Sequence, residues 1–345
     1  MYIRSRVPLR IGFAGGGTDV SPYCDEYGGI VLNATIDRYA SITLRPTKND
    51  DVIVRSIDYD MTVNYKIDEE LAFNGQLDLI KGVLKVMKKE FGLNEGVEVF
   101  VQNDAPPGSG LGSSSAICVA LIGAFVEWLR LPLTPYEIAD LAFKIERIDM
   151  GIKGGRQDQY AAAFGGFNFM EFYKDRTIVN PLRLPQEIID ELQYSLVVAY
   201  IGGSHESAGI LDRQIENVKR RSKNSLKALH GLKNMAIEMK NALVTGKLGR
   251  FGKLLDKEWE YKKQMASGIS NAKIDAIYES AIKAGALGGK ISGAGGGGYM
   301  FFFADFDKRY SVIDALKSNG AEIVNFSFTN HGLRTWKVGE REEIS

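Results

Sequence analysis

A run of glycine and serine at residues 104–116, DAPPGSGLGSSSA, separates two segments with different hydrophobic patterns. Residues 97–102 have the β-branched and aromatic content of a strand, and residues 115–129 are almost continuously apolar, as a buried helix is. The chain must therefore pass from a strand into a buried helix through a glycine-rich loop. This junction constrains the fold, because it places freely oriented N–H groups beside the positively polarised start of a helix.

The loop matches neither of the common phosphate-binding motifs. No lysine follows Gly112, which excludes G-x-x-x-x-G-K-[ST], and Gly108, Gly110 and Gly112 follow G-x-G-x-G rather than G-x-G-x-x-G. Two interpretations stay open from these residues alone. The loop is either a nest of backbone N–H groups that holds phosphate, or a tight turn whose serines cap the helix.

The rest of the chain predicts an α+β protein of two domains. A chain of 345 residues exceeds the roughly 100–200 residues that one domain usually holds. Strand and helix patterns occur in both halves, and we place the boundary in the irregular segment 181–188, which gives domains 1–185 and 186–345. The patterns predict strands at residues 41–47, 51–57, 61–67, 97–102, 164–173, 194–202, 298–303 and 322–328. They predict helices at residues 77–91, 115–129, 134–148, 273–285 and 310–320, and a helical stretch over 211–264 that breaks near Gly246 and Gly249.

Charge and hydropathy exclude several classes of partner. The 43 basic and 43 acidic residues balance, which argues against a nucleic-acid or membrane-surface partner. The most apolar run, residues 116–126, is too short to span a bilayer, and the N-terminal residues show no apolar core of a secretory signal. We therefore expect a cytoplasmic protein. The sequence leaves the oligomeric state open, a homodimer included.

Two further glycine-rich stretches accompany the first. PLRIGFAGGGTD, residues 8–19, holds Arg10 and Asp19 around a glycine cluster, and KISGAGGGG, residues 290–298, precedes an expected strand. In this order, the three stretches resemble the GHMP kinases, the family of galactokinase, homoserine kinase, mevalonate kinase and phosphomevalonate kinase. The resemblance covers residues 7–303. It implies an N-terminal domain like domain 2 of ribosomal protein S5, a C-terminal ferredoxin-like domain, and ATP and a small-molecule substrate in the cleft between them.

The resemblance also implies roles for individual residues. Ser114 and Glu146 match the family's Mg²⁺ ligands, Asp158 the carboxylate beside the attacking hydroxyl, and Arg10 the cation that contacts it. The implied nucleotide contacts are Pro107, Gly108, Ser109, Gly110, Leu111, Gly112, Ser113, Ser114 and Ser115. The implied contacts on the substrate side are Gly15, Gly16, Gly17, Thr18, Asp19, Lys153, Arg156, Gly293, Ala294 and Gly295.

Each charged residue also has a plain structural interpretation. Glu146 could pair with Arg147 on a helix surface, Asp158 could cap the following helix, and Lys153 and Arg156 could be solvated loop residues. His205 is one of three histidines and has no partner pattern, so a structural role or a substrate contact is favoured over metal binding.

The first glycine stretch bears on the substrate. Galactokinase has a glutamate and a histidine at the positions of Gly16 and Gly17, so galactose is in doubt here. GFAGGGTD resembles the branch that phosphorylates the C1 hydroxyl of D-glycero-D-manno-heptose 7-phosphate, which implies a sugar phosphate substrate and a 1,7-bisphosphate product. The alternatives are a free-sugar 1-kinase of the fucose or galactose type and a non-catalytic sugar-binding regulator.

Overall fold

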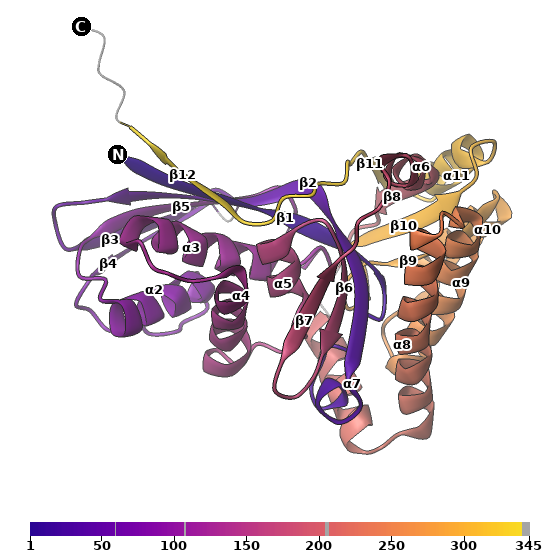
Figure 1. The fold of residues 1–345 in the computed structure, drawn as a ribbon, viewed down its shortest axis with the longest axis horizontal. Helices are drawn as coiled ribbons and strands as arrows, with labels where there is room; N and C mark the ends of the chain where they lie inside the picture. Colours follow the sequence, from indigo (N-terminus) through magenta and orange to yellow (C-terminus); the bar gives the residue numbers. More distant parts are fainter. Residues whose placement is uncertain (59, 107, 204–206, 340–345) are drawn as a thin grey trace, which may run out of the picture.

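The computed structural model describes residues 1–58, 60–106, 108–203 and 207–339, and the described strands form two sheets (Figure 1). Pro107 and His205, both singled out from the sequence, lie outside these residues. Each sheet and its helices form one unit, and residues of both units line a shared cavity.

The first sheet has eight described strands in the order β12-β1-β2-β5-β3-β4, with β6 paired to β2 and β7 to β6. Its neighbours are antiparallel except β3 and β5, which are parallel. The strands are β1 (Tyr2–Ala14), β2 (Gly29–Pro46), β3 (Asp51–Ser56), β4 (Met61–Lys66), β5 (Val97–Asn103), β6 (Phe167–Phe172), β7 (Thr177–Pro181) and β12 (Arg334–Val338). The expected strand at 41–47 is the end of the much longer β2. Its beginning was missed because residues 31–36 are all buried and show no alternation.

The helices of this unit pack below the sheet in Figure 1. They are α1 (Tyr23–Tyr27), α2 (Asp78–Phe91), α3 (Ser113–Leu129), α4 (Pro135–Phe143), the π-helical segment η1 (Lys144–Asp149) and α5 (Gln157–Phe164). The apolar α3 is the buried central helix, as its sequence predicts. Thr134 and Glu137 form the capping box at the start of α4. The expected helix 134–148 continues from α4 into η1, whose wider turn contains Glu146.

The second unit is built on a four-stranded antiparallel sheet in the order β11-β8-β10-β9, as described. This order, with helices between β8 and β9 and between β10 and β11, is the expected ferredoxin-like arrangement. Its elements are α6 (Gln186–Ser195), β8 (Leu196–Tyr200), α7 (Ser207–Lys219), α8 (Lys223–Val244), α9 (Leu248–Met265), α10 (Ala272–Lys283), β9 (Ala286–Ile291), β10 (Tyr299–Ala304), α11 (Arg309–Ser318) and β11 (Glu322–Val324). Helices pack on both faces of the second sheet, α9 on one and α10 and α11 on the other, and α8 also contacts the first sheet.

Three expectations about this unit were inaccurate. The segment 181–188 is not wholly irregular, because α6 begins at Gln186 and buries Ile189 and Leu192. The helical stretch 211–264 is three helices: besides the expected break at Gly246, the chain turns between α7 and α8, where Arg221 has a φ of 53°. The expected strand 322–328 ends at Val324.

The C-terminal segment returns to the first sheet. After β11 the chain crosses to β2, where the N–H of Asp37 donates to the carbonyl of Ser327 (2.9 Å), and then forms β12 beside β1 (Figure 1). Sequence patterning did not predict this strand, since alternation indicates a strand but not the sheet that it joins. Among the described residues, no helix is long and apolar enough to cross a membrane.

Candidate active site

A cavity of about 190 Å³ lies between the two units. Residues expected from the sequence line much of it: Arg10, Gly16, Gly17, Asp19, Gly108, Gly110, Gly112, Ser113, Ser114, Ser115, Lys153, Asp158, Gly293 and Ala294. Three glycine-rich loops that are far apart in the sequence therefore meet around one space. We name them by position: the 15–19 loop, the 108–112 loop and the 293–298 loop.

The 108–112 loop has the conformation that its glycines permit. Gly108, Gly110 and Gly112 have φ values of 71°, 84° and 77°, in the left-handed region that disfavours other residues. Gly112 is the N-cap of α3 and no side chain caps this helix, so the interpretation in which serines cap it is wrong. The start of α3 borders the cavity, because Ser113, Ser114 and Ser115 line it, and the first N–H groups of a helix have no partner within the helix.

The 293–298 loop packs directly on the 108–112 loop. A Cβ on Gly293 would lie 2.5 Å from Gly110 Cα, and a Cβ on Gly110 would lie 2.3 Å from Ser292 O. Ser292 Oγ donates to Gly110 O (3.0 Å), and the N–H of Tyr299 donates to Ser109 O (3.1 Å). The close approach of two backbones explains why glycine is needed at both contact points.

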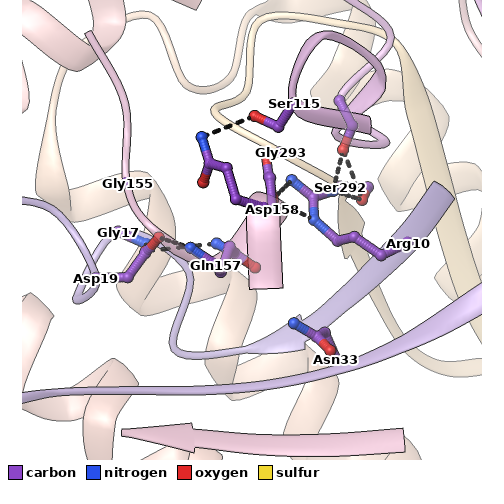
Figure 2. A network of polar contacts seen from close by, with 12 residues as sticks. Arg10, Gly17, Asp19, Asn33, Ser115, Gly155, Gln157, Asp158, Ser292 and Gly293 are labelled. Carbon is purple, nitrogen blue, oxygen red and sulfur yellow. Dashed lines mark hydrogen bonds and ion pairs between the residues drawn. The ribbon is translucent and has the colours of Figure 1, made fainter. Parts of the chain in front are cut away.

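Arg10 and Asp158 form a buried ion pair at the cavity wall (Figure 2). Arg10, on β1, donates from Nε to Asp158 Oδ1 (2.7 Å), and its Nη2 lies 2.6 Å from the same oxygen. The Arg10 Nη1 donates to Gly110 O and to Ser292 Oγ (3.3 Å). Asp158 lies in the first turn of α5 and keeps 20% of its side-chain surface exposed, so its carboxylate is held by one cation while still reaching the cavity.

Glu146 lies behind the start of α3 with no exposed surface. Its carboxylate accepts hydrogen bonds from Ser114 Oγ (2.9 Å), Ser115 Oγ (2.6 Å) and Gln159 Nε2. Arg147 Nη2 lies 3.9 Å away, so the expected neighbour pair is at best a long one. Of these groups, Ser114 is exposed and lines the cavity, which makes the pair of Ser114 and Glu146 reachable from it.

Asp19 is oriented by the segment that precedes Asp158. Its carboxylate accepts from the N–H groups of Gly17 (3.1 Å) and Gln157 (3.1 Å) and from Gln157 Nε2 (3.4 Å) (Figure 2). Burial raises the pKa of Asp19, and the charge of Asp158 adds to this. A Cβ on Gly155 would lie 1.9 Å from Asp19 Oδ2, so glycine is required where the two segments touch.

Of the two cations expected to bind a substrate phosphate, only one lines the cavity. Lys153 is exposed and lines the cavity. Arg156 is turned away from it: its guanidinium donates to Tyr173 O (2.7 Å), pairs with Asp25 (3.3 Å) and stacks over the Phe143 ring. Arg147 also lines the cavity and holds the 153–155 backbone through Lys153 O (3.3 Å) and Gly155 O (3.4 Å).

A second cavity of about 260 Å³ adjoins the first. The two share Gly108, Ser113 and Ser114, so the start of α3 separates them. Apolar side chains near α2, β5 and α3, including Leu77, Ile80, Val101 and Ile117, line part of the second cavity, and polar residues such as Asp78 and Asn103 line the rest. A partly apolar pocket beside a glycine-rich loop and the start of a helix fits a ligand with a flat apolar part and an anionic part.

Sequence reasoning missed several cavity residues, among them Gln157, Lys262 and Lys290, and it also missed Ser292, which accepts a hydrogen bond from Arg10. Gln157 and Ser292 are uncharged neighbours of expected residues, and a search for charged groups passes over them. Lys262 belongs to the run KEWEYKK, in which sequence alone cannot separate a buried lysine from solvated ones. Within the described ranges, no group of three or more His, Cys, Asp or Glu side chains could hold a metal ion.

Comparison with known proteins gives the family. The profile of the GHMP kinases N terminal domain matches residues 78–166, and that of the GHMP kinases C terminal domain matches residues 239–322. The chain is 44% identical to the D-glycero-alpha-D-manno-heptose 7-phosphate kinase of Campylobacter jejuni, over 97% of this chain and 99% of that one.

A solved structure, titled a D-glycero-D-manno-heptose 1-phosphate kinase from Bacteroides thetaiotaomicron, has a TM-score of 0.83 and 38% identity, and the match covers 98% of this chain and 100% of that one. A third relative, the L-fucokinase/L-fucose-1-P guanylyltransferase of Bacteroides fragilis, is 30% identical over 87% of this chain but only 34% of its own length.

The expected family, two-domain fold and reaction class are thereby confirmed. The matched profiles cover both sides of the cavity, with the 108–112 loop and Asp158 in one and α9 and the 293–298 loop in the other. The chain belongs to the GHMP kinase family, whose members are phosphotransferases that use ATP and an alcohol acceptor.

Proposed function

We propose that this protein transfers the γ-phosphoryl group of ATP to the C1 hydroxyl of D-glycero-D-manno-heptose 7-phosphate and forms the 1,7-bisphosphate. The observation that carries the proposal is the Arg10–Asp158 pair, which faces the cavity beside the free N-terminus of α3. A product of this kind would serve cytoplasmic synthesis of nucleotide-activated heptose.

The nucleotide fits across the two cavities. Its phosphates would lie at the 108–112 loop and the start of α3, where glycine N–H groups and the helix dipole favour negative charge. Its base would enter the partly apolar second cavity, past Gly108, Ser113 and Ser114. This placement leaves the cavity side of Gly16, Gly17 and Asp19 for the acceptor.

The pair of Ser114 and Glu146 fits Mg²⁺. A buried carboxylate and an exposed hydroxyl in mutual contact are both hard oxygen ligands, and Mg²⁺ usually takes one or two carboxylates together with phosphate oxygens. Bound there, Mg²⁺ would neutralise charge on the phosphate oxygens. Ser115 and Gln159 would fix the orientation of the Glu146 carboxylate.

Asp158 and Arg10 perform the transfer in this proposal. Asp158 accepts the proton of the acceptor hydroxyl, the hydroxyl oxygen bonds to the γ-phosphorus, and the bond from that phosphorus to the β–γ bridging oxygen breaks to release ADP. Arg10 fixes the orientation of Asp158 through two contacts to Oδ1 and places a positive charge beside the reacting groups. Positioning and charge compensation are the main requirements of phosphoryl transfer, and both are supplied here by buried, hydrogen-bonded groups.

The sugar is the part of the proposal that depends most on relatives. The two heptose kinase names differ in the phosphate that they place on the substrate, at position 7 in one and position 1 in the other. We favour the 7-phosphate, with Lys153 near the distal phosphate, because Lys153 lines the cavity and makes no ion pair within the described chain. The 30% identity to a fucokinase keeps a free-sugar 1-kinase as the second candidate.

A substrate screen tests the assignment. ADP release is measured with heptose 7-phosphate, heptose 1-phosphate, unphosphorylated heptose and L-fucose at equal concentrations, and ³¹P NMR identifies the product. We expect kcat/KM to be largest for heptose 7-phosphate, with a new anomeric phosphate signal. Preference for heptose 1-phosphate would move the acceptor away from C1, and preference for a free sugar would support the second candidate. Sugar binding without ADP release would indicate a regulator.

A further inference from the structure

Two lysines of the second unit line the cavity, although both side chains are buried. Lys262 lies on α9 and Lys290 on β9, with relative exposures of 2% and 1%. Lys290 has a structural partner, since its Nζ donates to Glu258 Oε1 (2.8 Å) and to Phe13 O (3.1 Å). Lys262 donates to one acceptor, the carbonyl of Gly293 (2.6 Å), and within the described chain no carboxylate lies within ion-pair distance of it. A buried ammonium without a counter-charge is costly, which favours a role for Lys262 in binding an anionic ligand.

Lys262 lies where the three glycine-rich loops converge. Its contact with Gly293 ties it to the 293–298 loop, which in turn packs on Gly110 of the 108–112 loop. A Cβ on Gly16 would lie 3.8 Å from Lys262 Nζ, which places the amine beside the 15–19 loop as well. The amine therefore stands between the proposed phosphate and acceptor sides of the cavity.

The other cation at these loops, Arg10, already uses most of its donors. The Arg10 guanidinium contacts Asp158, Gly110 O and Ser292 Oγ, which occupy Nε, Nη1 and Nη2. Lys262 makes one hydrogen bond of the three that an ammonium group offers. Of the two cations, Lys262 has more donors left for a ligand.

The charges around Lys262 favour an incoming anion. Burial is the main cause that lowers its pKa, to about 7, and Lys290 and Arg10 act in the same direction, while Glu258 and Asp19 act against it. A phosphate group placed beside the amine would offset both burial and the neighbouring cations, and would favour the ammonium form.

We propose that Lys262 contacts the phosphoryl group during its transfer, as a second cation beside Arg10. Charge spreads over the equatorial oxygens of that group in the transition state, and a cation fixed in a dry site stabilises it without reorganisation. The inference rests on the proposed kinase reaction but not on the identity of the sugar.

The test compares Lys262→Met with the wild type, using whichever acceptor the wild-type enzyme phosphorylates. We expect kcat to fall about 10²–10³-fold, as for the loss of one donor to a developing charge. KM for the acceptor and the affinity for ADP should change little. Methionine has a similar length and no charge, so the melting temperature should hold. The matched control is Lys290→Met, which leaves Glu258 buried without its cation and should lower the melting temperature instead.

A measurement of ligand affinity tests the proposal independently of the reaction rate. Calorimetry compares ADP alone with ADP plus aluminium fluoride, a mimic of the phosphoryl group in transfer. Lys262→Met should bind ADP as the wild type does, and should lose at least about tenfold affinity when the mimic is present. Three results would each overturn the inference: a kcat near that of the wild type, a higher KM for the acceptor with unchanged kcat, or an equal loss of affinity for ADP alone. The last result would show that Lys262 merely holds the 293–298 loop.

Discussion

Asp158 and Glu146 are two carboxylates on either side of the start of α3, and their surroundings differ. Asp158 has one cation partner, Arg10, and part of its surface reaches the cavity. Glu146 is fully buried and receives hydrogen bonds from two hydroxyls and an amide. One carboxylate is placed to exchange a proton with a ligand, while the other is fixed by donors on several sides.

The same contrast separates Lys153 from Arg156, three residues apart in one loop. Lys153 faces the cavity, and Arg156 binds Asp25 and the Tyr173 carbonyl. In both pairs, residues that look equivalent in the sequence differ in how many hydrogen bonds and ion pairs they make within the protein. We infer that, of Lys153 and Arg156, the one that faces the cavity without an ion pair contacts substrate, and that the other holds the fold.

The largest effect is expected for Asp158→Asn. Asparagine keeps an acceptor for Arg10 but is a far weaker base, so we expect kcat to fall about 10²–10⁴-fold. ATP affinity, measured by calorimetry, should stay close to the wild-type value because Asp158 is not assigned to the nucleotide. Near-normal turnover would show that this carboxylate caps α5 and is not the base.

Glu146→Gln should weaken Mg²⁺ binding, whereas Asp158→Asn should impair proton transfer. The charge of the carboxylate is lost but its size is kept, so the Mg²⁺ concentration for half-maximal rate should rise by about 10–100-fold or more, the range typical of residues that support a metal site. The rate at saturating Mg²⁺ should recover much further than in Asp158→Asn. The measurement is a Mg²⁺ titration of initial rate with a melting curve as control. An unchanged titration would contradict the assignment of Glu146.

The sequence predicted those parts of the site that depend on local chemistry. The glycine spacing of the 108–112 loop indicated its special backbone, and Gly110 has a positive φ; Arg10, Ser114, Glu146 and Asp158 come together in two contacting pairs. Glycine loops at strand ends carry their geometry in a few consecutive residues. Their order along the chain was enough to indicate the family.

The parts that were missed depend on tertiary contacts. The direction of Arg156 is decided by Asp25 and Tyr173, which lie far from it in sequence. The burial of Lys262 results from the packing of α9 against β9, which the charged run around it conceals. β12 was missed for the same reason, because pairing with β1 is a property of the assembled sheet.

The smallest effect is expected for Lys153→Ala. Its comparison with Arg156→Ala tests most directly whether the cation that faces the cavity, and not the ion-paired one, binds the substrate. Lys153 makes no ion pair within the described chain and lines the cavity, so its loss should raise KM for heptose 7-phosphate about tenfold, which corresponds to one weakened charge-assisted contact. Its kcat should change little, because the distal phosphate is bound equally in ground and transition states. Its melting temperature should match the wild type.

Arg156→Ala should show the opposite profile. Asp25 loses its cation, the Tyr173 carbonyl loses a donor and Phe143 loses the stacked guanidinium, so the melting temperature should fall while KM stays within a few-fold. Unphosphorylated heptose serves as the control substrate, since Lys153→Ala should leave its KM unchanged. If Arg156→Ala raised KM for the phosphorylated sugar alone and Lys153→Ala did not, the guanidinium would have to leave Asp25 for the substrate, and the inference that the cation facing the cavity binds the substrate would be wrong.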